Sequence, residues 1–135
     1  MTRARRTTIA VIGDTHADAR SRFDEHNRVM AWCAADFAAR GADLVIHTGD
    51  IYEGVSVPAE RAFVETWCQT VCESSPFIIV GGNHEREGDV TALGRLRTKH
   101  PITTTESPLV VTAAGVAVAC LPWPRKANLL AALGR

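Results

Sequence analysis

The sequence lacks any long apolar run. No stretch approaches the roughly 20 consecutive apolar residues that a membrane-spanning helix requires. The run from Ile9 to Ile12, which follows a short cluster of arginines, is too short for a secretory signal. We therefore expect a cytoplasmic protein that makes no contact with a membrane.

The sequence also lacks an excess of either charge. Its 15 Lys and Arg residues balance 15 Asp and Glu residues, so no overall field attracts the protein to nucleic acid or to an anionic membrane. Any such binding has to come from local patches.

Cysteine pairs at C-x-x-C spacing are absent as well. The four cysteines are Cys33, Cys68, Cys72 and Cys120, and two of them lie one helical turn apart within an apolar stripe. We expect buried, reduced thiols.

What is present is typical of one small domain. Of the 135 residues, 46% are hydrophobic and 22% are charged, which is ordinary for a globular protein. There is no internal repeat and no low-complexity linker. We expect residues 1–135 to form a single domain.

An apolar run breaks into a polar turn three times along the chain. The expected strands cover residues 8–12, 44–48 and 77–80. Two helices are expected between them: the first has Asp24 as its N-cap, and the second begins at Pro58. Alternating strands and helices predict a parallel sheet with helices packed on its faces. The nearly continuous apolar strands indicate burial on both faces.

Each expected helix has an apolar stripe. Val29 and Cys33 belong to the stripe of the first helix, and Trp67 belongs to that of the second, whose polar side includes Glu60. Trp32 and Trp67 are expected to pack in the core or at a subunit contact.

The sequence pattern changes in the last third of the chain, where the expected elements are shorter. A weaker helix is expected over residues 91–99, and a hairpin is expected from residues 109–112 and 116–121. A final helical segment, residues 126–133, has no strand after it to complete a crossover. We expect an α/β layered fold with a parallel βαβαβ start and a β-hairpin near the C-terminus, truncated after the final segment.

The three polar turns carry the residues that suggest chemistry. Asp14 and His16 follow the first strand, Asp50 follows the second, and Asn83 and His84 follow the third. Sites in open parallel sheets form at the carboxyl ends of the strands, so these side chains should meet there.

The residue types suit a pair of metal ions. Asp14 and His16, two positions apart, can face the same side and hold one ion. The two oxygens of Asp50 can bridge two ions, and the amide oxygen of Asn83 is a neutral ligand. His84 can reach a substrate. A purely structural pattern gives no reason for this set at three successive strand ends.

The motifs resemble the opening motifs of the calcineurin-like metallophosphoesterases. Within that superfamily the arrangement looks most like the DNA exonuclease subunits of the Mre11 and SbcD type. The sequences that carry the resemblance are Gly13-Asp14-x-His16, His47-Thr48-Gly49-Asp50-Ile51, Gly82-Asn83-His84-Glu85 and Leu121-Pro122-Trp123-Pro124.

The resemblance implies a role for each residue. Asp14 and His16 would bind the first metal ion, Asp50 would bridge both ions, and Asn83 would bind the second. His84 would contact the scissile phosphate and assist the leaving oxygen. The two divalent ions would be Mn²⁺, with Fe, Zn or Mg as alternatives, and a hydroxide bridging them would attack phosphorus.

The sequence departs from the superfamily in two ways. Glu85 stands where the nuclease branch usually has Asp. The later histidines of the superfamily site are missing, because only His100 follows His84 and no Gly-His pair occurs. The resemblance therefore covers the amino-terminal half of a catalytic domain, and we expect this chain alone to bind metal weakly and to have little activity.

The resemblance also suggests partners and leaves alternatives open. The leading hypothesis is a DNA exonuclease or endonuclease, with DNA as substrate, an SMC-like ATPase subunit as partner and a homodimer as a further assembly. One alternative is a phosphatase or small-molecule phosphodiesterase of the same superfamily. Another is a catalytically incomplete fragment that binds without reacting.

Several neighbours of the motifs have two interpretations. His47 could support the site, but a core histidine satisfied by the backbone is the simpler expectation. Tyr52 and Glu53 follow Asp50 closely enough to contact a substrate, and Arg86 could meet a phosphate. Trp123 could anchor a loop beside the site, although packing is the simpler expectation.

Overall fold

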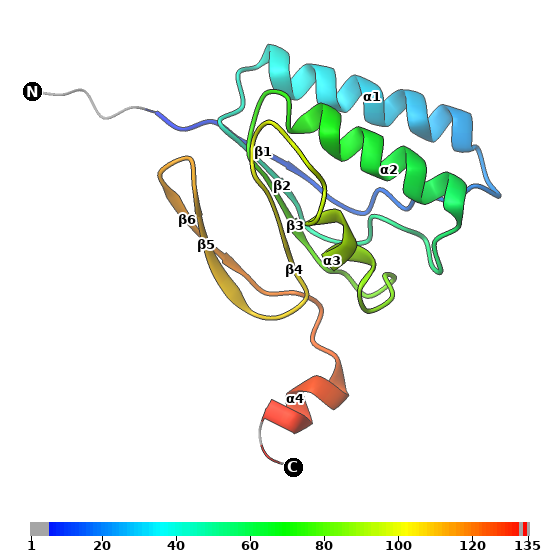
Figure 1. Ribbon diagram of the computed structural model, residues 1–135, viewed down its shortest axis with the longest axis vertical. Helices are drawn as coiled ribbons and strands as arrows, with labels where there is room; N and C mark the ends of the chain where they lie inside the picture. Colours follow the sequence, from blue (N-terminus) through cyan, green and yellow to red (C-terminus); the bar gives the residue numbers. More distant parts are fainter. Residues whose placement is uncertain (1–5, 133, 135) are drawn as a thin grey trace, which may run out of the picture.

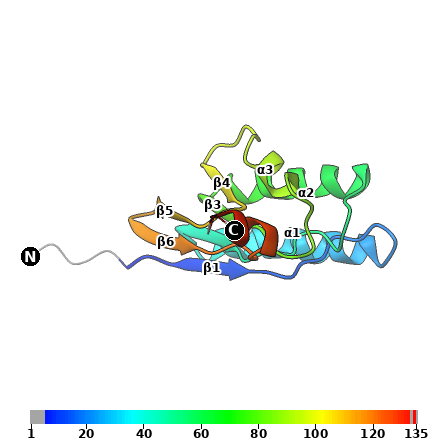
Figure 2. The same cartoon turned by 90° about the horizontal axis from the view of Figure 1, so that it is seen from below.

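Four parallel strands form the central sheet. The computed structural model describes residues 6–132 and 134. The strands are neighbours in sequence order, with β1 and β4 at opposite edges (Figures 1 and 2). They are β1 (Ile9–Ile12), β2 (Leu44–His47), β3 (Phe77–Val80) and β4 (Ile102–Thr105).

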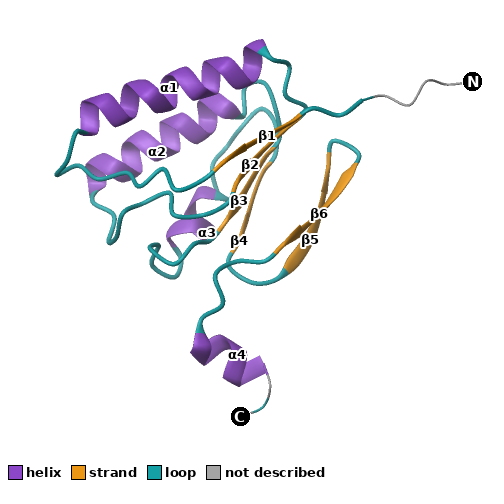
Figure 3. Ribbon diagram, turned by 180° about the vertical axis from the view of Figure 1, so that it is seen from behind, coloured by secondary structure: helices purple, strands orange, loops and turns teal. Residues whose placement is uncertain are grey.

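Helices cover one face of this sheet, and a hairpin covers the other (Figure 3). The helices α1 (Phe23–Ala39) and α2 (Pro58–Val71) lie side by side on the first face. The hairpin consists of β5 (Leu109–Ala113) and β6 (Val116–Cys120). Its turn is Ala114-Gly115, where both residues have positive φ angles, as a tight two-residue hairpin turn requires. The expected fold, with its parallel start and its late hairpin, is confirmed.

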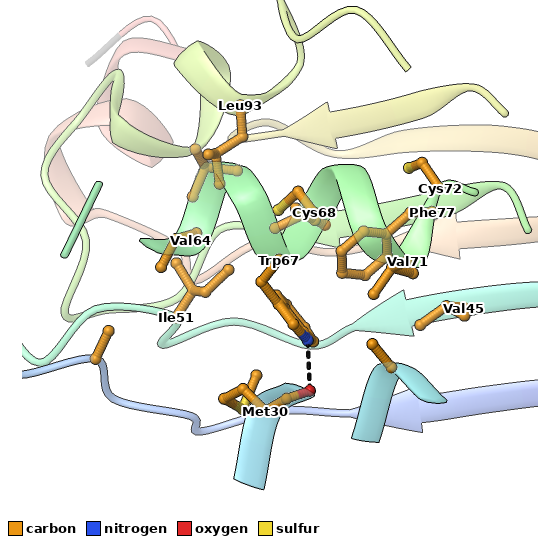
Figure 4. Close-up of a cluster of buried hydrophobic side chains, with 14 of the residues drawn as sticks. Met30, Val45, Ile51, Val64, Trp67, Cys68, Val71, Cys72, Phe77 and Leu93 are labelled. Carbon is orange, nitrogen blue, oxygen red and sulfur yellow. Dashed lines mark hydrogen bonds between the residues drawn. The ribbon is translucent and has the colours of Figure 1, made fainter. Parts of the chain in front are cut away.

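The period of two along the strands produces a core on each face. Val45, Phe77 and Ile79 point to the helices, whereas Leu44 and Ile78 point to the hairpin. This explains why the middle strands are apolar without interruption. Figure 4 shows the helix-side core, where the indole N–H of Trp67 donates a hydrogen bond of 2.8 Å to the carbonyl of Met30 and so ties α2 to α1.

The hairpin core does not extend to β1. Ala10 and Ile12 pack into the helix-side core, so the alternate residues Ile9 and Val11 face the hairpin side. Ile9 is exposed, and Val11 remains 63% exposed. An apolar strip on this edge strand is therefore uncovered by the residues that the structure describes.

Several expectations about the helices were wrong. The buried face of α1 contains Met30 and Ala34, while Val29 is exposed. Trp32 is 64% exposed and lies outside the core, so only the alternative of a subunit contact remains as a prediction. Glu60 is buried rather than on the polar face of α2, because its carboxylate accepts hydrogen bonds from the backbone N–H groups of Val57 and Ala19.

Other element boundaries also differ from the prediction. The helix α1 begins at Phe23, so Asp24 lies in its first turn rather than at the N-cap. The weak helix is the short α3 (Asp89–Leu93). The helix α4 (Lys126–Ala132) follows β6, as expected. No helix in the described residues is long and apolar enough to span a membrane.

Candidate metal centre

The three polar turns meet at the carboxyl edge of the sheet. The loop after β1 continues beside the loop after β2, since Asp14 N–H donates to Gly49 O and His16 N–H donates to Asp50 O, both over 3.0 Å. Ala17 N–H extends this ladder to Ile51 O over 2.8 Å. The backbone thus places the first two motifs next to each other.

Three of the four predicted metal ligands lie in a strained backbone conformation. Asp14, His16 and Asp50 have φ angles of 53°, 48° and 57°. In the described chain, only Arg22 and Ala114 are other non-glycine residues with positive φ. Such conformations cost of order 1–3 kcal/mol each and persist where the surroundings enforce them, often at functional sites.

Two glycines allow the second and third loops to touch. A Cβ atom on Gly49 would lie 2.8 Å from the Cα of Gly82, and a Cβ on Gly82 would lie 2.8 Å from Cγ of Asp50. Both distances are far shorter than a normal contact. The backbones of the two loops therefore approach as closely as glycine permits.

The strand ends bring together three side chains that could hold one metal ion. One atom each from Asp14, His16 and Asp50 lies within 4.8 Å of the others, and Oδ1 of Asp14 is 3.7 Å from Nε2 of His16. The first two motifs therefore supply two carboxylates and one imidazole to the same point, a donor set that suits first-row divalent ions.

Glu53 adds a second group around His16. One atom each from His16, Glu53 and His84 also lies within 4.8 Å of the others. Glu53 Oε2 is 2.8 Å from His16 Nδ1, but the approach is not aligned as a hydrogen bond, and this buried nitrogen has no hydrogen-bond partner in the described structure. A nitrogen without a partner beside a carboxylate fits a position that a cation completes.

His84 is held beside this group through its main chain and its ring. Its backbone N–H donates to Oδ1 of Asp50 over 3.0 Å. Nδ1 is 2.7 Å from the carbonyl oxygen of Glu53. This hydrogen bond is the main reason why the pKa of His84 is raised. Partial desolvation of the ring lowers the pKa, whereas the negative charges of the nearby carboxylates, of which Asp50 has the largest effect, raise it further. The rings of His84 and His16 meet edge to face, with centroids 4.8 Å apart.

Asn83 lies on the same cleft as the carboxylates. The cleft has a volume of about 310 Å³, and its lining includes Asp14, Asp50 and Asn83 as well as the segment from Leu121 to Pro124. Asn83 is exposed. The structure thus brings all five predicted site residues to one strand edge, with Asn83 and His84 flanking the cluster of the first two motifs.

Sequence reasoning missed the role of Glu85. Its buried carboxylate accepts hydrogen bonds from the N–H groups of Gly82 at 2.8 Å and Asp50 at 3.3 Å, and also from that of Ile51. The buried carboxylate of Glu85 therefore joins the loop after β2 to the loop after β3. A glutamate directly after a Gly-Asn-His sequence gives no such signal by itself.

His47 and Tyr52 support the site from the core. His47 is fully buried, as expected, and burial lowers its pKa to about 4. Gly49 N–H donates to Nδ1 over 3.1 Å, so Nε2 carries the proton and donates to the Thr15 hydroxyl 3.0 Å away. Tyr52 is 1% exposed, which removes the alternative that its side chain contacts a substrate.

The comparisons with known proteins point to one family. Residues 7–120 match the family described as calcineurin-like phosphoesterase. No curated protein matches the sequence.

A solved structure with a similar fold is that of the nuclease MPE from Pseudomonas putida, with a TM-score of 0.52 and 19% sequence identity. The similarity covers 76% of this chain and 50% of the nuclease chain. This chain therefore spans about half the length of that protein, and at this identity the likeness concerns the fold alone.

Proposed function

The chain belongs to the calcineurin-like phosphoesterase family, and from this premise we propose that it binds two divalent metal ions and hydrolyses phosphodiester bonds in DNA. The family implies a metal-dependent hydrolase. The observation that carries the proposal is the convergence of Asp14, His16 and Asp50 within 4.8 Å at the strand ends.

In this proposal each polar loop has its own task. Asp14 and His16 would hold one ion, Asp50 would supply a carboxylate oxygen to each ion, and Asn83 would offer its amide oxygen to the second. Divalent ions held there would polarise the phosphoryl group and lower the pKa of a water molecule. The mixture of oxygen and nitrogen donors favours Mn²⁺, with Fe, Zn and Mg as the other ions to test.

The hydrogen bonding of His84 suits contact with the substrate. The carbonyl oxygen of Glu53 can only accept, so Nδ1 of His84 must donate to it, and Nε2 is the nitrogen left for another partner. We assign to Nε2 the contact with the scissile phosphate and the leaving oxygen. Two hydrogen bonds, from the backbone N–H and from Nδ1, hold the residue for this task.

DNA is the proposed substrate because the motifs resemble those of the Mre11 and SbcD type of DNA exonuclease subunit, and the solved structure of similar fold is that of a nuclease. The test compares linear DNA with p-nitrophenyl phosphate, both in Mn²⁺, for the full-length protein, for Asp50→Asn and for Asp24→Asn. Full-length here means residues 1–135 together with any sequence that follows them, because little activity is expected of residues 1–135 alone. The control residue Asp24 is exposed in the first turn of α1. We expect DNA cleavage that only Asp50→Asn abolishes. Ready hydrolysis of the monoester with intact DNA would instead identify a phosphatase.

An SMC-like ATPase subunit and a homodimer belong to the same proposal, as does action in the cytoplasm, where DNA would be available. Light scattering on the purified protein tests the homodimer. Co-purification from cells tests for an ATPase partner. A monomer that cleaves DNA without a partner would remove both assemblies and leave the chemistry intact.

A further inference from the structure

The backbone of Trp123 is fixed beside the third polar loop. Its N–H donates a hydrogen bond of 3.0 Å to the carbonyl of Gly81, at the end of β3. Pro122 and Pro124 on either side restrict the chain. Arg125 adds a second attachment, since its guanidinium donates to the carbonyl of Glu85 over 2.7 Å. The segment is thus held in place by its main chain and by Arg125.

The indole itself has little contact with the fold. Trp123 is 58% exposed, so the expectation that it packs was wrong. It lines the 310 Å³ cleft together with Asp14, Asp50 and Asn83. An exposed aromatic side chain on a fixed backbone therefore borders the cleft that contains the candidate metal ligands, and core packing does not account for it.

We propose that Trp123 stacks against an unpaired nucleobase adjacent to the scissile phosphate, so that the preferred substrate is single-stranded or frayed DNA. This inference rests on the proposed function and names the form of its substrate. A base inside a duplex has both faces covered by its neighbours, whereas an unstacked base offers one face to an aromatic side chain.

The charges around Trp123 favour base stacking, rather than electrostatic attraction to phosphates alone, as the main source of affinity for DNA. An adjoining cleft of about 790 Å³ shares Trp123 and is also lined by Arg86, Arg125 and the three glutamates Glu85, Glu87 and Glu106. Duplex binding without base contacts depends on neutralising many phosphates with Lys and Arg. A lining of two arginines and three glutamates does not provide that, so the aromatic face is the stronger source of affinity.

The test measures binding of two fluorescent probes by anisotropy in Mn²⁺. Both probes carry phosphorothioate linkages, which resist hydrolysis, and a denaturing gel confirms that they stay intact. One probe is a thymidine single strand of about a dozen nucleotides, within the site sizes typical of single-strand binding. The other has the same backbone without bases. We expect Trp123→Ala to weaken binding of the thymidine strand by roughly fivefold to hundredfold, and to change binding of the abasic strand less than about twofold.

Two variants act as controls. Trp123→Phe keeps an aromatic face and should retain most of the affinity for the thymidine strand. Trp32→Ala removes an equally exposed tryptophan that lines neither cleft and should leave both probes unaffected. Equal losses on the two probes, or no loss on either, would overturn the stacking proposal.

Binding of Mn²⁺ to the same proteins separates this proposal from the function on which it rests. If Trp123→Ala binds Mn²⁺ normally but the two probes behave alike, stacking fails and the metal centre stands. If Asp50→Asn binds Mn²⁺ as well as the parent protein, the metal centre itself is wrong, and the stacking proposal falls with it.

Discussion

Oδ1 of Asp50 accepts a hydrogen bond from the backbone N–H of His84 over 3.0 Å. The two residues follow different strands, β2 and β3, so this bond joins the loops that carry the second and third motifs. It also orients the Asp50 carboxylate before any ion is bound. The close approach of the two loops at Gly82 makes the bond possible.

Replacement of Gly82 should therefore damage the site. In Gly82→Ala the new methyl group would overlap the Asp50 carboxylate, and we expect a loss of about 1–3 kcal/mol in the free energy of unfolding together with loss of Mn²⁺ binding. Urea denaturation and calorimetry measure the two effects. Gly54→Ala is the matched control, because nothing lies within 4 Å of a Cβ atom at Gly54. Equal behaviour of the two variants would contradict the close approach.

Removal of the charge on Glu85 should loosen the same pair of loops. In Glu85→Gln one of the two oxygens that accept backbone N–H bonds becomes an amide NH₂ group, which cannot accept them. We expect the free energy of unfolding to fall by about 2 kcal/mol. The exposed neighbour offers the control Glu87→Gln, for which the denaturation midpoint should not move. An unchanged midpoint in Glu85→Gln would show that its hydrogen bonds are dispensable.

His47 should make stability depend on pH. Its pKa of about 4 in the folded protein lies below the ordinary value of about 6.5 expected after unfolding. Between these values the unfolded chain binds a proton that the folded chain excludes, so stability falls as the pH falls. From about pH 7.5 to about pH 5 the loss attributable to His47 is about 2 kcal/mol.

The check on His47 is a set of urea denaturation curves across that pH range. In His47→Asn the titrating group is gone, so the dependence on pH should be shallower than in the parent protein. Parallel pH profiles for the two proteins would mean that folding does not lower the pKa of His47, contrary to its burial between Thr15 and Gly49.

The indole of Trp67 should stabilise the helix layer. Trp67→Phe removes its hydrogen bond to Met30 and part of the packing between α1 and α2. We expect a loss of about 2 kcal/mol by urea denaturation, whereas Trp32→Phe on the exposed face of α1 should have almost no effect. Similar losses for both variants would contradict the assigned core.

The strands and the polar turns were predictable because their patterns are local. β3 is buried on both faces, and such a strand reads as an unbroken apolar run. Asp14, Asp50 and Asn83 each lie two or three positions after the end of a strand, and the parallel topology brings the strand ends to one edge. Local sequence order was therefore enough to place the candidate site.

Other features depend on contacts between distant residues. β4 was not identified as a fourth parallel strand, because three threonines in Ile102–Thr105 lack an apolar period and only pairing with β3 places them. Glu60 was assigned to a polar face because its acceptance of the Ala19 N–H, 41 residues away, is not visible in a helical pattern. The roles of Glu53 and Glu85 depend on loop contacts of the same kind.

The most direct test of the metal centre is calorimetric titration of the full-length protein with Mn²⁺, for the parent, Asp50→Asn and Asp24→Asn. The proposed arrangement predicts saturable binding in the parent and in Asp24→Asn that is lost in Asp50→Asn. Equal binding by all three proteins, or no binding by any of them, would contradict the assignment of these strand ends as a metal centre.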